Sequence, residues 1–456
     1  MEVKVRELEG RLLLGLAAAE RGHSVVLAHK SAIHSLLRED KLRPGIYHDK
    51  SLTPGQTRIA RCETLCRRGF SITSSDEEGG LLDEDYEGFA QERYSESTLR
   101  YASLVFSWGK HDYNSLVRIY PKFKDRFALT GNPRVDFWRR DMSAYYAEPK
   151  LDGVAQFVLI ASNLGTALNM NRVWSLAKNV RAKTCCLDGE KMRQEFRTYR
   201  ACAFELEMLP HFIQAIRSLA VAYPQVTFVV RPHPMEAEGA WQAMIGEISN
   251  VRVCRTGSIS HWIRSALALI HNGCTSALEA AACGTPVITF RPNKSELERD
   301  IPNRMGREAY DCDGLVQILG EILDQWVPYD WDDQDKRSIL LDRFTALDGP
   351  LAADRIVDRW EALSSPKLCQ RNDWTRLRRA LRLKKAKQFL TGWGPATPRG
   401  SRRDRLSTEH KFEDLTSEEL GSIISNLQRA LNRFHGVQLD RLNGRAVVLG
   451  QKGCVA

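Results

Sequence analysis

The chain has 456 residues, of which 43% are hydrophobic and 27% are charged, and its formal net charge is +9. That length exceeds the size at which one hydrophobic core stops growing, and about 150 residues per domain predicts two or three domains. No stretch approaches the ~20 consecutive apolar residues of a membrane span, and the start "MEVKVRELEG" lacks the apolar core of a signal peptide. We therefore expect a soluble, cytoplasmic protein.

The spacing of the cysteines and the position of the positive charge bear on whether the protein binds zinc or nucleic acid. The eleven cysteines are scattered without a C-x-x-C pair, so no structural zinc site is expected. Between Arg371 and Arg405, twelve Lys or Arg stand against two Asp. The basicity belongs to this segment, and no recognised nucleic-acid-binding module accompanies it.

Helix and strand signals alternate in the first third of the chain. "ELEGRLLLGLAAAERGHSVVLAHK" from Glu7 predicts an apolar helix, a Gly-His stop and a short strand. Further signals follow in "YASLVFSWGK" and "FALTGNPRVDFWRR". We expect a parallel α/β domain over residues 1–145, followed by a linker in "MSAYYAEPKLDGV".

A second α/β series follows the linker. Its predicted strands are "QFVLIASN", "VTFVVRPHP", "VRVCRT", "ALALIHNG" and "PVITFRP", with helices at "LPHFIQAIRSLAVAY" and "SALEAAACG". The fold class is therefore α/β, with a second Rossmann-like, doubly wound domain over residues 150–365. Residues 366–456 are expected to form a basic helical extension, in which Thr416 and Glu419 supply a capping box.

The strongest functional motif is "ALIHNGCTSALEAAACGTPVITFRP", residues 268–292. A strand ends at His271, Gly273 makes a turn, and a helix opens at Thr275 and Ser276. Unpaired N–H groups at a helix start can bind a phosphate, and hydroxyls there add donors. Glu279, one turn along, can take the hydroxyls of a ribose. The alternative is an ordinary strand-turn-helix with a Ser/Thr cap.

A second motif, "VVRPHPMEAE", places Arg231, His233 and Pro234 at the carboxyl end of a strand. Ligands gather at such ends in open α/β sheets, and an arginine offers a forked donor for phosphate. The two flanking prolines fix the backbone around the imidazole. The alternative is a structural histidine.

The stretch "TSSDEEGG" of residues 73–80 holds Asp76, Glu77, Glu78 and Gly79. It is either a solvated acidic turn or a site of proton transfer. If it is catalytic, crowding of the acids raises the pKa of at least one of them.

These motifs carry a resemblance. His-x-Gly, Ser, Glu-Ala and Gly-x-Pro resemble the nucleotide-binding half of GT-B glycosyltransferases, which have two Rossmann-like domains facing across a cleft. The order of Glu77-Glu78-Gly79, His233-Pro234 and Thr275-Ser276 is similar to bacterial sialyltransferases and Kdo transferases. That resemblance implies that Glu78 is the base and that the other two motifs hold the phosphate of a CMP-sugar.

Over most of residues 1–365 the chain also resembles bacterial surface carbohydrate biosynthesis proteins. The carrying stretches are "VKVRELEGRLLLGLAAAERGHSVVL", "LTGNPRVDFWR", "RPHP" and "HNGCTSALEAA". One departure is that almost nothing precedes Arg6, where a GT-B domain has its first strand.

The resemblance implies a metal-independent glycosyltransferase without a cofactor. Its donor would be a nucleotide sugar, with CMP-activated Kdo or a nonulosonic acid favoured, and its acceptor a surface polysaccharide or lipopolysaccharide. Glu78 would act as base or nucleophile. The alternatives are a nucleotide-sugar 2-epimerase of the same fold and a non-catalytic glycan assembly scaffold.

Weaker candidates complete the predicted site. Asn132 and Arg134 in "TGNPRVD" could line the cleft, and Asn163 and Gly165 in "ASNLG" could approach the donor sugar; simple turns are the alternative for both. The basic segment 374–393 could lie on anionic lipid at the inner face of the membrane, or dock as a solvated helix on the body.

Overall fold

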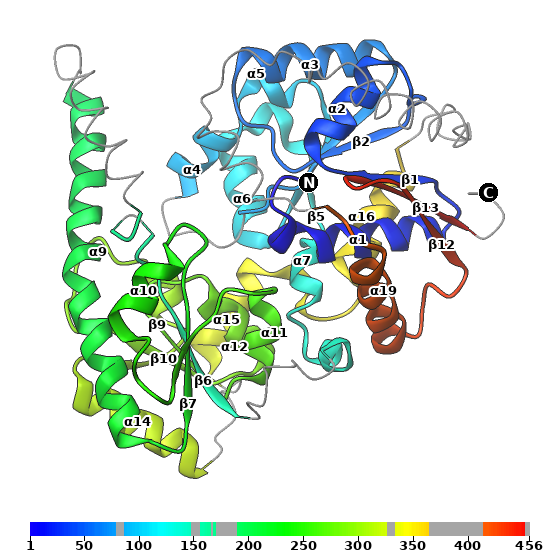
Figure 1. Cartoon of the computed structure of the whole chain (residues 1–456). Coiled ribbons are helices and arrows are strands. Elements are labelled where there is room, and N and C mark those ends of the chain that lie inside the picture. The colour runs from blue at the N-terminus through cyan, green and yellow to red at the C-terminus, as the bar shows by residue number, and fades with distance from the viewer. Residues whose placement is uncertain are drawn as a thin grey trace, which may run out of the picture. The chain divides into compact units, whose positions relative to one another are not determined.

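The computed structural model describes residues 1–78, 86–146, 156–165, 167–169, 189–325, 333–363 and 414–451. The chain divides into two units (Figure 1). Unit 1 consists of residues 1–80, 85–147 and 341–456, and unit 2 of residues 81–84 and 148–340. The candidate site residues are described separately for each unit.

Unit 1 contains a parallel sheet of four strands in chain order, β2-β3-β4-β5. The strands are β2 (Ile46–Asp49), β3 (Ser71–Ser74), β4 (Ala102–Ser107) and β5 (Phe127–Leu129). The helical segments along this part of the chain are α2 (Lys30–Arg38), α3 (Gln56–Arg67), α4 (Tyr86–Arg93), α5 (Glu96–Leu99), α6 (Lys110–Ile119), η1 (Pro121–Arg126), α7 (Pro133–Asp136) and η2 (Arg140–Tyr145). All carboxyl ends of these strands lie along one edge of the sheet.

The chain enters unit 1 through helix α1 (Lys4–Glu20), and no strand precedes this helix in the described residues. The apolar run predicted to be helical is buried, with Leu12, Leu13 and Leu16 fully inaccessible. Glu7 caps the helix start, because its carboxylate accepts the backbone N–H groups of Glu2 (2.8 Å) and Val3 (3.1 Å).

The last described segment is not only helical, which corrects the expectation of a helical extension over residues 366–456. After α19 (Ser417–Leu431), strands β12 (Val437–Asn443) and β13 (Ala446–Gln451) form an antiparallel sheet with β1 (Val25–Ala28). Residues 341–363, which carry η3 (Thr345–Leu347) and α16 (Ala352–Glu361), also cluster with unit 1 rather than with the second domain. The basic segment 374–393 lies outside the described residues.

Unit 2 contains a six-stranded parallel sheet in the order β11-β10-β9-β6-β7-β8. Its strands are β6 (Phe157–Ala161), β7 (Thr227–Arg231), β8 (Val251–Val253), β9 (Ala268–His271), β10 (Val287–Phe290) and β11 (Arg307–Ala309). This is the 3-2-1-4-5-6 order of a Rossmann fold, in which winding reverses between the first and fourth strands. Here that reversal separates β6 from β9.

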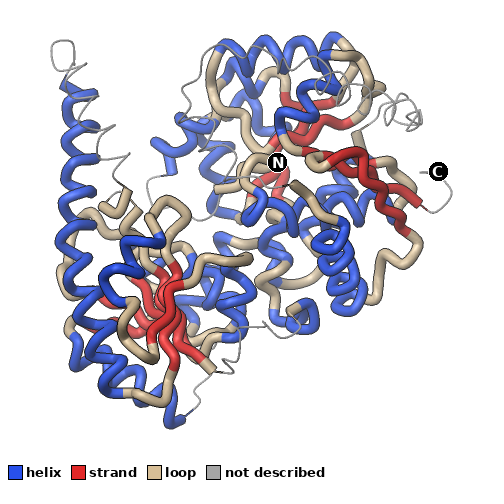
Figure 2. Tube along the Cα trace, in the orientation of Figure 1, coloured by secondary structure: helices blue, strands red, loops and turns tan. Residues whose placement is uncertain are grey.

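Helices cover the unit 2 sheet on both faces (Figure 2). The helices along this part of the chain are α9 (Gly189–Ala222), α10 (Glu238–Ile245), α11 (Ile259–Ser265), α12 (Ser276–Cys283), α13 (Asp300–Asn303) and α14 (Cys312–Gln325), and α15 (Gln334–Arg343) runs from unit 2 into unit 1. Side chains of α9, α10 and α14 share one core with the β-branched residues of the strands. The α/β class with two Rossmann-like units, expected from the sequence, is confirmed.

No helix in the described part of the chain is both long and apolar enough to cross a membrane. Among the same residues, no group of three or more His, Cys, Asp or Glu side chains is arranged to hold a metal ion.

Candidate functional site

The reversal of winding in unit 2 brings two predicted loops together. β6 and β9 are hydrogen-bonded neighbours whose carboxyl ends are Ala161 and His271. The loops that follow meet where Asn163 Nδ2 donates to the Gly273 carbonyl oxygen, at 3.2 Å. Ligands of open α/β sheets bind at this kind of switch point.

The loop after β9 is held by buried polar contacts. Gly273 has φ +58°, a left-handed conformation that favours glycine, and its N–H donates to Asn303 Oδ1 at 2.6 Å. The Cys274 N–H donates to His271 Nδ1 at 3.3 Å, while His271 Nε2 contacts Thr289 Oγ1 at 3.1 Å. The loop shape is therefore fixed before any ligand arrives.

His271 itself is placed as a structural residue. Its side chain is fully inaccessible, and burial lowers its pKa to about 3. Because both ring nitrogens have protein partners, a neutral imidazole fits this position. The structure assigns His271 to shaping the turn, in contrast to the direct ligand contact expected from the sequence.

The start of α12 carries the other predicted donors. Thr275 is the N-cap residue and its side chain makes no capping hydrogen bond. Ser276 Oγ is directed to Cys274 Sγ, at 3.0 Å. Glu279 is 1% exposed and accepts the Ser260 hydroxyl, which comes from α11, so the carboxylate expected to meet a ribose is engaged with protein.

Arg231, the last residue of β7, makes its contacts within the protein. Arg231 is 9% exposed and donates to the carbonyl oxygens of Thr256 (2.9 Å) and Gly257. Burial lowers its pKa to about 10. Its guanidinium therefore braces the loop after β8, rather than extending outward as the phosphate donor expected from the sequence.

His233 lies beside the loop after β6. Its Nδ1 accepts the Met235 N–H at 3.2 Å, so a neutral ring carries its proton on Nε2 and can donate there. A Cβ atom on Gly165 would lie 3.1 Å from the same Nδ1. The structure thus brings together Gly165 and His233, while Pro234 is exposed and its carbonyl accepts Arg255 at 2.5 Å.

One cation at this site escaped the sequence-based prediction. The backbone nitrogen and Cβ of Arg299 each lie 3.6 Å from the position that a Cβ of Gly273 would take. In the described part of the chain, the Arg299 side chain has no hydrogen-bond or ion-pair partner. Its place on the loop after β10 was the available signal, but Arg291, Lys294 and Arg304 nearby made it hard to single out.

In unit 1, the acidic stretch follows the carboxyl end of β3. Asp76 is 2% exposed, and its Oδ1 accepts the Glu78 N–H at 2.9 Å. Among the described residues its Oδ2 has no hydrogen-bond partner, and it lies 3.8 Å from Arg93 Nη1. Burial raises the pKa of Asp76 to about 6, which is the expected effect of removing a carboxylate from water.

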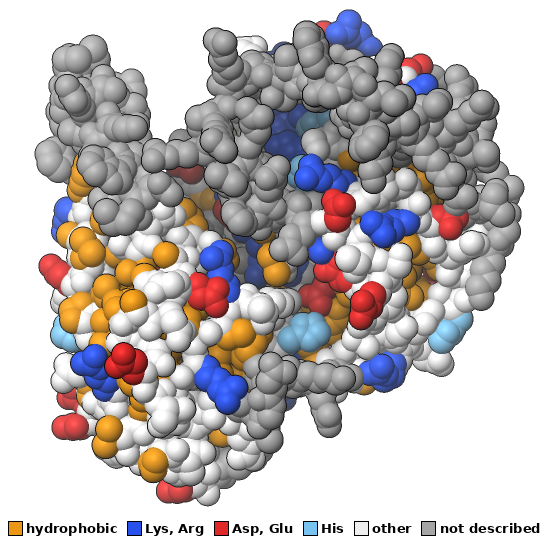
Figure 3. Space-filling model, in the orientation of Figure 1, with side chains coloured by type: hydrophobic (Ala, Val, Ile, Leu, Met, Phe, Trp, Pro, Cys, Tyr) orange, Lys and Arg blue, Asp and Glu red, His pale blue; other side chains and the backbone are white. Residues whose placement is uncertain are grey.

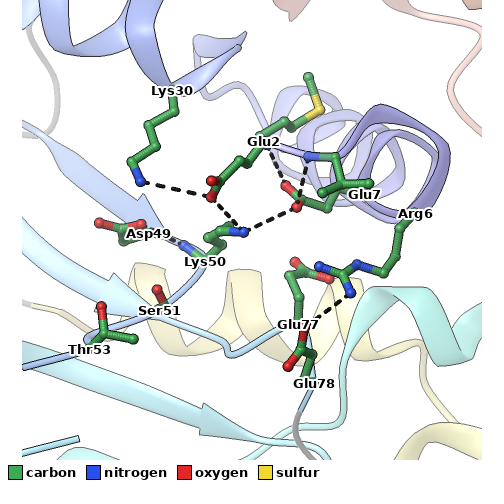
Figure 4. A network of polar contacts seen from close by, with 12 residues as sticks. Glu2, Arg6, Glu7, Lys30, Asp49, Lys50, Ser51, Thr53, Glu77 and Glu78 are labelled. Atoms are coloured by element: carbon green, nitrogen blue, oxygen red, sulfur yellow. Dashed lines mark hydrogen bonds and ion pairs between the residues drawn. The ribbon is translucent and has the colours of Figure 1, made fainter. Parts of the chain in front are cut away.

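The two glutamates are paired with arginines, as Figure 4 shows for Arg6 and Glu78. Arg6 Nη1 lies 3.2 Å from Glu78 Oε1, and Arg93 contacts the other oxygen. Glu77 is buried against Arg11. The stretch is therefore an ion-pair cluster, in which the Glu78 side chain is the most exposed acid at 41%. Gly79 lies outside the described residues.

Asn132 supports this cluster from the loop between β5 and α7. It is 2% exposed, donates to Ser75 Oγ at 3.0 Å, and accepts the Arg134 N–H at 2.9 Å as the cap of α7. The Arg134 guanidinium lies over the Trp138 ring, 5.5 Å from its centroid. Asn132 thus contacts the acidic stretch as a positioning residue, whereas Arg134 contacts Asn132 and Trp138.

A lysine near the end of β2 extends the network and was not predicted. Lys50 Nζ lies 2.7 Å from Glu2 and 3.5 Å from Glu7 (Figure 4). Burial alone would raise the pKa of Glu7, but Lys50 and the other cations hold it below its usual value. On the face that Figure 3 draws, acidic and basic side chains are likewise interspersed.

The comparisons with known proteins give structural similarity without a family. No family model and no curated protein matches this chain. A solved structure of S. aureus MnaA with UDP is 14% identical over 73% of this chain and 77% of that chain, with a TM-score of 0.40. The Methanocaldococcus jannaschii UDP-GlcNAc 2-epimerase with UDP-GlcNAc and UDP is 13% identical over 73% and 79%, with a TM-score of 0.42.

A third solved structure, the wall teichoic acid polymerase TagF soaked with CDPG, is 12% identical over 70% of this chain and 72% of that chain, with a TM-score of 0.40. Identities and TM-scores this low say nothing about the substrate or the reaction of this chain. The chain is thus similar in structure to a UDP-GlcNAc 2-epimerase and to a wall teichoic acid polymerase.

Proposed function

We propose that the protein is a glycosyltransferase and that unit 2 binds its nucleotide-sugar donor at the switch point between β6 and β9. The observation that carries the proposal is the meeting of three loops there. Asn163 contacts Gly273, and Gly165 lies against His233. A Rossmann sheet places nucleotides at this position.

The local chemistry suits a phosphate group. The start of α12 provides N–H groups and the positive end of a helix dipole. His233 can donate from Nε2, and Arg299 supplies a positive charge next to the Gly273 turn. Such groups stabilise the charge that develops on a leaving nucleotide.

Unit 1 supplies the acid-base group in this proposal. An acceptor hydroxyl must lose a proton during glycosyl transfer, and a carboxylate within reach can take it. Glu78 is the acid that an acceptor can reach, because Asp76 and Glu77 are buried. Arg6 and Arg93 fix the orientation of its carboxylate, whether it acts as base or as nucleophile.

The donor and acceptor are proposed from the order of the motifs. An acidic motif, His233-Pro234 and Thr275-Ser276 together favour CMP-activated Kdo or a nonulosonic acid. The proposed acceptor is a surface polysaccharide or lipopolysaccharide, and the segment 374–393 would provide contact with anionic lipid.

Thermal unfolding with CMP, UDP, GDP and ADP tests the proposal, using wild type, His233→Ala and the exposed control His435→Ala. A ligand at 100 times its Kd adds about 2.7 kcal/mol, which raises Tm by several degrees. We expect CMP to stabilise wild type and His435→Ala, and His233→Ala to lose the effect. Stabilisation by UDP alone would contradict a CMP-sugar donor and indicate a hexosyltransferase or an epimerase. The absence of a Tm shift with every nucleotide would contradict the proposal as a whole.

A further inference from the structure

A buried carboxylate connects the two loops of the candidate nucleotide site. Glu236 follows the "RPHP" stretch and is 2% exposed. Its Oε2 accepts the Ser162 hydroxyl at 2.6 Å and the Trp241 indole N–H at 2.7 Å, and its Oε1 accepts the Leu164 N–H at 2.6 Å. Both carboxylate oxygens therefore have protein donors.

Two of the three hydrogen-bond donors to Glu236 come from the loop after β6. Ser162 and Leu164 flank Asn163 in the loop after β6, and both donate to Glu236. The Glu236 N–H in turn donates to the His233 carbonyl oxygen at 2.8 Å. One residue thus joins the loop that carries Asn163 to the turn that carries His233.

An ionised carboxylate is the side chain that matches this arrangement. It has only acceptors, and three donors point at its two oxygens. A glutamine would turn an N–H group toward either Leu164 or the Ser162 and Trp241 pair, leaving donors that face each other. Burial raises the pKa of Glu236, while the hydrogen bonds from Ser162, Trp241 and Leu164 oppose that shift.

We propose that Glu236 is a positioning residue of the nucleotide site, setting the distance between Asn163 and His233 so that both engage the same ligand. The inference rests on the proposed function of unit 2. We therefore expect that a substitution that removes the hydrogen bonds of Glu236 lowers nucleotide affinity more than does a substitution elsewhere in unit 2 with the same loss of stability. A misplacement of ligand groups by about 1 Å can cost on the order of 100-fold in activity.

Calorimetric titration tests the inference with CMP, or with whichever nucleotide of the panel stabilises wild type. The test variants are Glu236→Gln, Glu236→Asp and Ser162→Ala. The controls are Glu238→Gln, an exposed acid two residues along, and Leu319→Ala, which opens the buried core of α14 away from the loops. Titrations are run below the unfolding transition of each variant.

We expect Kd to rise about tenfold or more for Glu236→Gln, with smaller rises for Ser162→Ala and for Glu236→Asp, which keeps the carboxylate. Leu319→Ala should lower Tm while leaving Kd unchanged, and Glu238→Gln should change neither. A folded Glu236→Gln protein with wild-type Kd, or a Kd that rises equally in Leu319→Ala, would overturn the inference alone. Failure of wild type to bind any nucleotide would overturn the proposed function and, with it, the inference.

Discussion

At the scale of single residues, Asp76 is a buried acid of the predicted acidic stretch. In the described part of the chain its Oδ2 has no hydrogen-bond partner, and Arg93 lies at 3.8 Å. Burial raises its pKa to about 6 from 3.8. The folded state therefore binds a proton more tightly than the unfolded chain does, so Asp76 contributes stability below pH 4 that is lost as pH rises through about 6.

Asp76→Asn should remove this pH dependence, because an amide keeps an acceptor for the Glu78 N–H and carries no charge. The free energy of unfolding of the variant, relative to wild type, should rise by up to about 3 kcal/mol between pH 4 and pH 8. Urea unfolding across that range measures it, with the exposed Asp125→Asn as control. A difference that stays constant with pH would show that Asp76 is ionised at no cost.

The sequence offered candidate site residues, but it could not predict the contacts that each of them makes. His233 and His271 both follow strands near prolines or glycines, and both were expected to bind the nucleotide. The structure gives the two histidines different roles, because His271 has no exposed surface and hydrogen-bonds to Thr289 and Cys274. Such contacts join residues from different strands, and residue type and spacing do not specify them.

At the scale of elements, the site depends on how closely the loop after β6 approaches the loop after β7. Gly165 makes that approach possible, since a Cβ there would lie 3.1 Å from His233 Nδ1 and 3.3 Å from Met235 Cβ. Those distances are shorter than ordinary van der Waals contacts. A side chain at this position would displace the imidazole.

Gly165→Ala should therefore weaken nucleotide binding about tenfold while lowering the stability of unit 2 by about 1 kcal/mol. Gly239→Ala is the matched control, because a Cβ at that position in α10 meets nothing within 4 Å and alanine favours a helix. Titration and thermal unfolding of the two variants measure both quantities. Equal affinity in the two variants would show that the close approach has no bearing on the ligand.

Among the elements, strands β6 to β10 of unit 2 were predicted from the sequence, whereas β11, β12 and β13 were missed. Asn443-Gly444 lies between two runs of alternating residues, which is a hairpin signal in the sequence. The pairing of β13 with β1 was beyond prediction, because Leu449 aligns with Val25 at the other end of the chain.

At the scale of the whole molecule, unit 1 is completed by the late segments of the chain. Arg433 donates to Glu20 of α1 (2.7 Å) and to Asp354 of α16 (2.7 Å), so one side chain connects three segments. The Phe434 N–H also donates to Glu20, at 2.9 Å. The segment 414–451 is therefore part of the unit 1 structure.

Arg433→Ala should lower the free energy of unfolding of unit 1 by about 1–3 kcal/mol, because it leaves two acids without their charged hydrogen bonds. Arg429→Ala, which replaces an exposed residue of α19, should change it by less than about 0.5 kcal/mol. Denaturant unfolding compares them. A stable, unchanged Arg433→Ala protein would indicate that the late segment contributes little to unit 1.

If a nucleotide binds at the switch point of unit 2, amide hydrogen exchange with and without CMP will locate it. We expect slower exchange in peptides that contain residues 161–165, 231–236 and 271–279, and no such change in His233→Ala. Protection confined to other peptides, or none at a nucleotide concentration that saturates binding, would contradict it.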